Sequence, residues 1–152
     1  MQTDVADQKV VVFRVGREEY AVSITAVKEV IPWIQPTPVP DAPAVVEGVV
    51  DLRGEVIPII DMARLFRSAR QHDDAGSRII VMEVGGQQAG FVVDSVTEVH
   101  TVVPGSVAPP SPVLRITRGD AGAVVSGILK MGENRLVVLV DPVRILSAAQ
   151  VA

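Results

Sequence analysis

Few residues of this 152-residue chain carry the side chains that perform acid, base or metal chemistry. It has two histidines, His72 and His100, and no cysteine. His72 lies beside Asp73 and Asp74 in a polar loop with no second histidine at ligand spacing, and His100 continues a valine-rich strand. Neither arrangement indicates a metal site or a general base. The sequence therefore predicts no catalytic residue, no metal ligand and no cofactor-binding residue.

The remaining chemical motifs point the same way. The adjacent acids Glu18 and Glu19 are interpreted as solvated charges in a turn, because neighbouring residues there do not converge on a pocket. No G-x-G-x-x-G, Walker or G-x-S-x-G pattern occurs, and Gly85-Gly86 instead favours a hairpin turn. We expect a protein that is not an enzyme.

Composition excludes several classes of partner. The chain is 48% hydrophobic with a formal net charge of -4 and only five aromatic residues, whereas proteins that bind nucleic acid carry basic surfaces. The start of the chain, Met1 to Gln8, does not resemble a signal peptide, and the longest apolar runs fall far short of the roughly 20 residues needed to span a bilayer. We expect a soluble, cytoplasmic protein with no direct membrane insertion.

Valine-rich runs broken by glycine and proline predict that the secondary structure consists mainly of short strands. Asp61 and Asp141 are candidate N-caps of two short helices, Met62 to Phe66 and Pro142 to Leu146. Arg67 to Ser77 and Pro104 to Pro112 are expected to be loops. The clearest predicted strands are Lys9 to Val15, Tyr20 to Ile24, Gly48 to Leu52, Glu55 to Ile60, Arg78 to Val84, Ala89 to Val93, Val124 to Leu129 and Arg135 to Val140.

The sequence repeats itself. Lys9 to Val30 aligns without gaps on Arg78 to Val99 at an offset of 69, with six of 22 positions identical. A second block, Val56 to Phe66, aligns on Leu136 to Leu146 at an offset of 80, and its Asp and Arg both recur. Two homologous β halves follow from this pattern.

Each half suits a small closed barrel of about five strands. We predict a mainly all-β fold of two such barrels related by duplication, with short helices. The halves cover roughly residues 9–70 and 78–149, and residues 1–8 form a flexible N-terminus. Sequence leaves open whether each half forms its own barrel or whether strands are exchanged between them.

One loop-strand-turn-strand unit concentrates unusual residues. The segment Ile31 to Asp61 contains the only tryptophan, five prolines before Ala44, and an arginine beside a glycine in Asp51-Leu52-Arg53-Gly54. Gly54 supplies permissive backbone angles for a turn, and Arg53 would project near it. An ordinary surface hairpin with an exposed arginine explains the pattern equally well.

These residues carry a resemblance to a known family. The segment GVVDLRGEVIPIIDMARLF, preceded by VGREEYAVSITAVKEVI, resembles the CheW family of bacterial chemotaxis coupling proteins. The family's signature reads G-V-x-N-L-R-G-x-(V/I)-(V/I)-P-(V/I)-(V/I)-D-(L/M). Further matches are the strand at Glu18 to Val22, a V-x-E-(V/I) turn at Val27 to Val30, and DSVTEV in the second half. The resemblance extends from about Lys9 to Ala149, which makes residues 9–149 a single CheW-like domain.

The resemblance implies a non-enzymatic adaptor of two five-stranded barrels. Such proteins bind the cytoplasmic tip of chemoreceptors in a groove between the barrels, and bind the regulatory domain of the histidine kinase CheA by barrel ends. That function places the protein at receptor arrays under the inner membrane. It also implies an ion pair between Glu29 and Arg53 near the receptor groove. The residues that contact the kinase stay unknown.

A receptor tip is helical, and a helix is bound by an apolar groove with a charged rim. Val27, Val30, Val96 and Val99 are candidates for the groove floor, although valines in strands are also ordinary core residues. Gly48 and Gly54 are expected to form turns beside it.

Asp51 departs from the family, which most often has Asn at this position. Asp cannot donate the hydrogen bond that an Asn amide supplies. It could accept one from an N–H of the turn, or it could pair with Arg53 and compete with Glu29.

Two alternatives stay open. The same scaffold could serve a chemosensory system that controls pili, gliding or cyclic dinucleotide output. A second, different class is a β-barrel that binds a small ligand or an oligonucleotide, with Trp33 and Tyr20 as stacking groups, although such proteins use more aromatic residues and a basic groove.

Overall fold

Runs of valine and isoleucine form two β-sheets in the computed structural model, which describes residues 8–66, 76–109 and 124–149. Sheet A is ordered β8 (Ser95–Thr101), β1 (Lys9–Val15), β2 (Glu18–Ser23), β11 (Arg135–Val140), β10 (Val125–Met131) and β9 (Val107–Ala108). Sheet B is ordered β3 (Val27–Pro32), β6 (Arg78–Val84), β7 (Gln87–Val93), β5 (Glu55–Asp61) and β4 (Val46–Leu52). The predicted mainly β fold of two small barrel-like sheets is confirmed.

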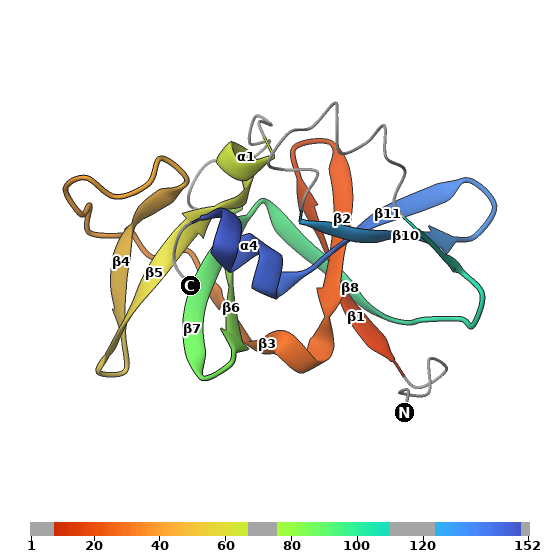
Figure 1. Ribbon diagram of the computed structural model, residues 1–152, viewed down its shortest axis with the longest axis horizontal. Coiled ribbons are helices and arrows are strands. Elements are labelled where there is room, and N and C mark those ends of the chain that lie inside the picture. The colour runs from red at the N-terminus through yellow and green to blue at the C-terminus, as the bar shows by residue number, and fades with distance from the viewer. Residues whose placement is uncertain (1–7, 67–75, 110–123, 150–152) are drawn as a thin grey trace.

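The two sheets exchange hairpins between the halves of the chain. Sheet A takes the hairpin β1–β2 from the first half and β8 to β11 from the second, and sheet B takes β6–β7 from the second half and β3 to β5 from the first. The two exchanged hairpins join their hosts by parallel pairing, β2 with β11 and β7 with β5. Figure 1 shows sheet B at one end of the long axis and most of sheet A at the other. Each half therefore depends on the other to complete its sheet.

Three apolar clusters explain why so many strand positions are apolar. The largest contains Phe13, Tyr20, Met82 and Phe91, and draws on both sheets and both helices. Alternate residues of the same strands face a second cluster within sheet A, around Val12 and Leu129, or a third within sheet B. Strands buried on both faces read as continuous apolar runs, as the sequence predicted.

The helices begin where the sequence placed them. In α1 (Met62–Leu65) the Asp61 carboxylate accepts a hydrogen bond from the Ala63 N–H at 2.9 Å, and in α4 (Pro142–Ala148) Asp141 accepts one from the Val143 N–H at 2.9 Å. Both aspartates cap helices by satisfying an N–H that the first turn leaves unpaired. A third, 3-10 helix, η2 (Ile24–Ala26), connects β2 to β3.

Two strands were not predicted, β3 and β9, and β8 was expected only as the valine-rich strand that carries His100, without bounds. Charged residues interrupt β3 and β8, so their apolar pattern is weak, and β3 occupies the Val27–Val30 segment that the resemblance had described as a turn. The expected loop at Pro104 to Pro112 contains the short β9, and His100 lies half-buried in β8. His72, Asp73, Asp74 and most of the Arg67–Ser77 loop lie outside the described residues. Among the described helices, none is long and apolar enough to cross a membrane.

Candidate functional site

The candidate site begins at the two-residue turn between β4 and β5. Leu52 pairs with Glu55, which leaves Arg53 and Gly54 as the central residues, with φ angles of 51° and 89°. Positive φ at both positions is the requirement of a type I′ hairpin turn. The Asp51 carboxylate accepts a hydrogen bond from the Gly54 N–H at 2.8 Å. Of the two roles open to Asp51, the structure therefore shows the turn acceptor.

Arg53 occupies this turn against its backbone preference. A side chain in the left-handed region costs about 1–2 kcal/mol relative to glycine. The two-residue turn between β6 and β7 avoids that cost by using Gly85 and Gly86, with φ angles of 58° and 82°, which also confirms the hairpin predicted there. An arginine at a position that favours glycine indicates a functional role for its side chain.

That side chain forms an ion pair with Glu29 on β3, as the resemblance implied. Because β3 and β4 are the two edge strands of sheet B, the pair links the open edges of the sheet. The Arg53 side chain is 65% exposed and that of Glu29 is 28% exposed. An ion pair so exposed stabilises a protein by only about 0–1 kcal/mol, less than the backbone cost of Arg53. Stability does not explain this arginine.

The four candidate valines divide into two pairs. Val30 on β3 is 41% exposed and Val99 on β8 is 57% exposed, and both strands are sheet edges. Val27 and Val96 are half-buried and pack against the central core. The structure thus leaves Val30 and Val99 accessible to a partner, while Val27 and Val96 also serve the core.

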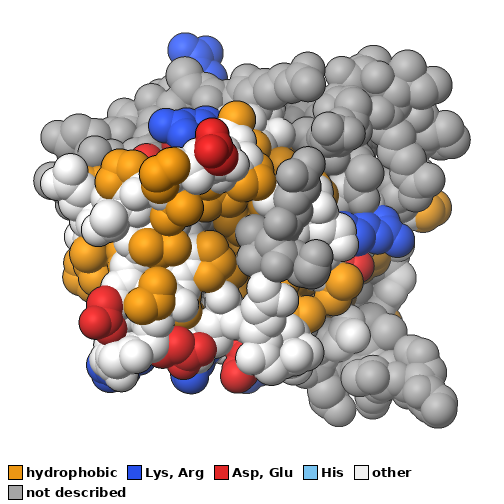
Figure 2. Space-filling model, turned by 60° about the vertical axis from the view of Figure 1, so that its left-hand side comes forward, with side chains coloured by type: hydrophobic (Ala, Val, Ile, Leu, Met, Phe, Trp, Pro, Cys, Tyr) orange, Lys and Arg blue, Asp and Glu red, His pale blue; other side chains and the backbone are white. Residues whose placement is uncertain are grey.

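Further apolar side chains are exposed on the side of the molecule that carries β4 and β5. Figure 2 shows apolar side chains gathered on this side between charged groups at the upper and lower margins. Ile34 is 41% exposed, Val39 is 42% exposed and Val56 is 64% exposed. An apolar surface bordered by charges is typical of a protein contact site.

Gly48 lies inside β4 and forms no turn, contrary to expectation. Its backbone has a φ of 154°, and a Cβ atom there would lie 2.2 Å from the carbonyl oxygen of Thr37. Thr37 approaches so closely because it exchanges two backbone hydrogen bonds with Val49, at 2.8 and 2.9 Å. Glycine is needed here for close approach of two backbones, and this contact secures the proline-rich loop to the hairpin that carries Arg53.

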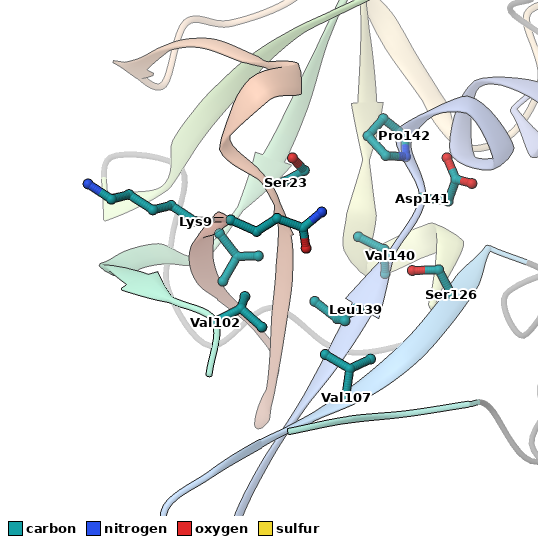
Figure 3. Close-up of a pocket in the computed structure, with 11 residues that line it drawn as sticks. Lys9, Ser23, Val102, Val107, Ser126, Leu139, Val140, Asp141 and Pro142 are labelled. Atoms are coloured by element: carbon teal, nitrogen blue, oxygen red, sulfur yellow. The ribbon is translucent and has the colours of Figure 1, made fainter. Parts of the chain in front are cut away.

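A pocket of about 280 Å³ lies elsewhere, in sheet A, and contains none of the candidate residues. Apolar side chains including Val102, Val107 and Leu139 line it, and Lys9 and Asp141 contribute charges (Figure 3). These residues come from the start of β1, from β9 and β11, from the N-cap of α4, and from the position directly after β8, which Val102 occupies. The strands β1 and β11 lie toward the opposite end of the long axis from the β4–β5 turn (Figure 1).

Sequence reasoning missed a second ionic cluster. Glu19 lies in β2, not in a turn, and its side chain is only 16% exposed. Its carboxylate accepts hydrogen bonds from Arg135 Nε at 2.9 Å and Nη2 at 2.8 Å, while Arg135 Nη2 also lies 3.1 Å from Glu98 Oε2. The hydrogen bond from Arg135 holds the pKa of Glu19 below its ordinary value, with further lowering by the charges of Arg135 and Arg14 and an opposing effect of burial. Glu19 and Arg135 are 116 residues apart, so only the duplication could have pointed to their contact.

The aromatic residues do not form a stacking platform. Tyr20 is 0% exposed and stacks on Phe66, with ring centroids 4.3 Å apart. Trp33 packs against the cluster within sheet B. The suggestion that Tyr20 stacks on a ligand is wrong, because its ring belongs to the central core. Within residues 8–66, 76–109 and 124–149, no group of three or more acidic or histidine side chains could hold a metal ion.

Comparison with known proteins gives consistent results. The family model for the CheW-like domain matches residues 9–150. "Chemotaxis protein CheW" of Rhizobium meliloti is 34% identical over 88% of this chain and 84% of the relative, and that of Klebsiella aerogenes is 32% identical over 95% and 85%. The crystal structure of scaffolding protein TtCheW from Thermoanaerobacter tengcongensis superposes with a TM-score of 0.80 and 35% identity, over 90% of this chain and 85% of that one.

Proposed function

Because this chain belongs to the CheW-like domain family, we propose that it is a non-enzymatic adaptor that couples chemoreceptors to a CheA-type histidine kinase in bacterial chemotaxis. The solved relative is described as a scaffolding protein, which agrees with a role that holds partners and performs no reaction. Such an adaptor acts where receptors assemble, on the cytoplasmic side of the inner membrane.

Arg53 is the observation that carries the proposed receptor site. It occupies a strained backbone position, and its ion pair with Glu29 contributes too little stability to offset that strain. The pair lies on β3 and the β4–β5 turn, and exposed Val30 follows Glu29 directly. Because successive strand residues face opposite sides of a sheet, Val30 and the Glu29 carboxylate lie on opposite faces of the edge strand β3. A helix laid along this open edge can meet the charged pair on one side of the strand and the apolar Val30 on the other. The receptor's helical tip is the partner with this chemistry.

The kinase requires a separate surface, because an adaptor must hold both partners at once. We assign it to the sheet A pocket, whose apolar walls could receive an apolar side chain of the kinase regulatory domain. Val107 is 42% exposed at this pocket, so it is open to a partner. The distance between the pocket and the β4–β5 turn along the molecule supports simultaneous binding (Figure 1).

Binding of each partner can be tested separately. Arg53→Glu should abolish retention of this protein on an immobilised receptor-tip fragment, and retention on the kinase regulatory domain should persist. Val107→Asp should do the reverse. Arg17→Glu, in the exposed β1–β2 turn, makes the same charge change away from both surfaces and should bind both partners normally.

A charge-exchanged variant separates the ion pair from the individual charges. Glu29→Arg combined with Arg53→Glu keeps an ion pair but exchanges the positions of its positive and negative charges. If the receptor contacts these charges directly, the double variant should fail to bind it. Normal receptor binding by Arg53→Glu would refute the site, even if the kinase still binds.

A further inference from the structure

The exchange of hairpins presents the chain with a choice between two similar partners. The hairpins β1–β2 and β6–β7 are homologous, and so are the sheets that receive them. In an unexchanged arrangement β1 would pair with β3, and β2 would pair with β5, each half completing its own sheet. Something in the sequence must favour the observed arrangement over this alternative.

Polar contacts at the start of the parallel strand pairs distinguish the two arrangements. In sheet A, Glu19 of β2 binds Arg135 of β11 through two hydrogen bonds. In sheet B, Gln88 of β7 donates a hydrogen bond to Glu55 of β5, from Nε2 to Oε1 at 2.5 Å. Gln88 is the counterpart of Glu19 at the offset of 69, and Arg135 is the counterpart of Glu55 at the offset of 80.

The unexchanged arrangement would remove both favourable contacts. In the unexchanged arrangement Glu19 would face Glu55, which places two carboxylates together at a site where Glu19 is largely buried. Gln88 would face Arg135, and its neutral amide oxygen would accept a hydrogen bond from the guanidinium in place of the paired hydrogen bonds to the Glu19 carboxylate, which is a weaker contact. The observed arrangement places each charged or polar group opposite a complementary one.

Side-chain size distinguishes the arrangements independently. Gly90 on β7 pairs with Ile59 on the host strand β5, and a Cβ atom at Gly90 would lie 2.7 Å from Cδ1 of Ile59. The other close atom, Cγ2 of Ile79 at 2.7 Å, belongs to the same hairpin as Gly90 and is common to both arrangements. Its counterpart on β2 is Ala21, which pairs with Leu139. In the unexchanged arrangement Ala21 would place its methyl group against Ile59. Sheet B therefore accepts the hairpin that carries glycine more readily than the hairpin that carries alanine.

We propose that two sets of contacts select the exchanged pairing of the two hairpins. The first set is polar and consists of Glu19–Arg135 and Gln88–Glu55, and the second is the close packing of Gly90 against Ile59. The exchange links the two sheets, because separating one half of the chain from the other would remove a hairpin from each sheet. This selection holds whatever partners the protein binds.

Engineered disulfides can report which pairing forms, because the chain has no cysteine of its own. Lys9 of β1 is the strand partner of Thr101 of β8. Both residues are exposed, and so is Pro32, the third position that the test uses. Lys9→Cys with Thr101→Cys therefore reports the exchanged pairing. Lys9→Cys with Pro32→Cys reports the unexchanged one, because Pro32 of β3 pairs with Arg78, the counterpart of Lys9. Cα atoms of paired strand residues lie within reach of a disulfide.

The test reverses the selecting charges in the full-length protein. Glu55→Arg with Arg135→Glu should place Glu19 opposite an arginine in the unexchanged pairing and opposite a glutamate in the exchanged one. The substitutions Lys9→Cys, Pro32→Cys and Thr101→Cys are combined in one protein, so that the two disulfides compete for the cysteine at position 9. After refolding from urea under oxidising conditions, the ratio of the 9–32 disulfide to the 9–101 disulfide should rise about tenfold over the same protein without the charge reversal. Glu133→Arg with Arg17→Glu exchanges charges at exposed turn positions that are strand partners of none of these residues, and should leave the ratio unchanged.

A neutral variant keeps the test decisive if charge reversal prevents folding. Glu55→Gln with Arg135→Gln removes the preference without creating repulsion, so the ratio should rise by a smaller factor while circular dichroism stays native. An unchanged ratio in a folded variant of either kind would overturn the role of the polar contacts. The steric contribution has its own test, since Gly90→Ala should raise the ratio and Gly90→Ala with Ile59→Val should restore it.

Discussion

Replacing Arg135 by glutamine tests the ionic cluster of sheet A. In the folded protein Arg135 donates two hydrogen bonds to the Glu19 carboxylate, at 2.9 and 2.8 Å, and lies close to Glu98. Glutamine keeps a polar side chain but removes the charge and the paired donors. Glu19 would retain Arg14, whose nearest nitrogen is 3.9 Å away, beyond hydrogen-bonding distance.

The expected loss of stability follows from the burial of the two partners. A hydrogen bond to a charged group contributes about 1.5–3 kcal/mol to stability. The Glu19 side chain is only 16% exposed, so water would replace the lost hydrogen bonds poorly. Arg135 is 40% exposed, so water screens part of the interaction. We therefore expect a loss of about 1–2 kcal/mol at pH 7, which corresponds to a fall in Tm of about 2–8 °C for a chain of this size.

This loss should depend on pH with a definite sign. Arg135 holds the pKa of Glu19 below its ordinary value of 4.5 in the folded state. The pair therefore contributes its full stability above that ordinary value, and the contribution disappears as the pH falls through the lower pKa of the folded protein. The difference in stability between native protein and Arg135→Gln should shrink on acidification.

Urea denaturation at pH 7 and at about pH 3 measures both effects. The native protein and Arg135→Gln should differ clearly at the higher pH and converge at the lower one, while Arg135→Lys should lie between them because it keeps the charge without the planar paired donors. Arg17→Gln, at an exposed turn position, is the control and should be neutral. An equal loss at both pH values, or none at pH 7, would refute this account of the cluster.

Three further substitutions test the geometry around the proposed surfaces. Gly48→Ala should destabilise the protein by more than about 2 kcal/mol in thermal denaturation, because its Cβ would lie 2.2 Å from the Thr37 carbonyl oxygen, and a smaller loss would mean that this backbone contact relaxes freely. Asp141→Ala should cost about 0.5–2 kcal/mol by removing the cap of α4, and an unchanged Tm would show that the cap is dispensable. Arg53→Gly should leave stability within about 1 kcal/mol, since relief of the positive φ offsets the lost ion pair, yet receptor binding should disappear; a larger loss would mean that the ion pair is structural.

Much of the fold could be predicted because its signals are local. The apolar runs of β1, β6 and β11 gave their bounds, and Asp61 and Asp141 act as caps through contacts only two residues along the chain. The strand β3 escaped detection, and the bounds of β8 around His100 stayed open, because both are sheet edges whose charged residues interrupt the apolar run.

The contacts that sequence reasoning missed are those between distant parts of the chain. Duplication predicted two similar halves, but it is compatible with exchanged and unexchanged hairpins, since each host strand has two homologous candidates. Glu19 looked like a solvated acid because its partner Arg135 lies in the other half. Gly48 looked like a turn residue because the approach of Thr37 depends on the path of a whole loop. By contrast, the Glu29–Arg53 pair was expected from family resemblance, which carries the long-range information that local patterns lack.

The central claim is that this protein bridges two partners through separate surfaces, and a three-component capture assay tests it most directly. The receptor-tip fragment is immobilised, and retention of the kinase regulatory domain is measured with and without this protein. The account predicts that the kinase domain is retained only when this protein is present, and that Arg53→Glu and Val107→Asp each abolish retention while Arg17→Glu does not. Retention that is unaffected by both substitutions would contradict the assignment of these two surfaces.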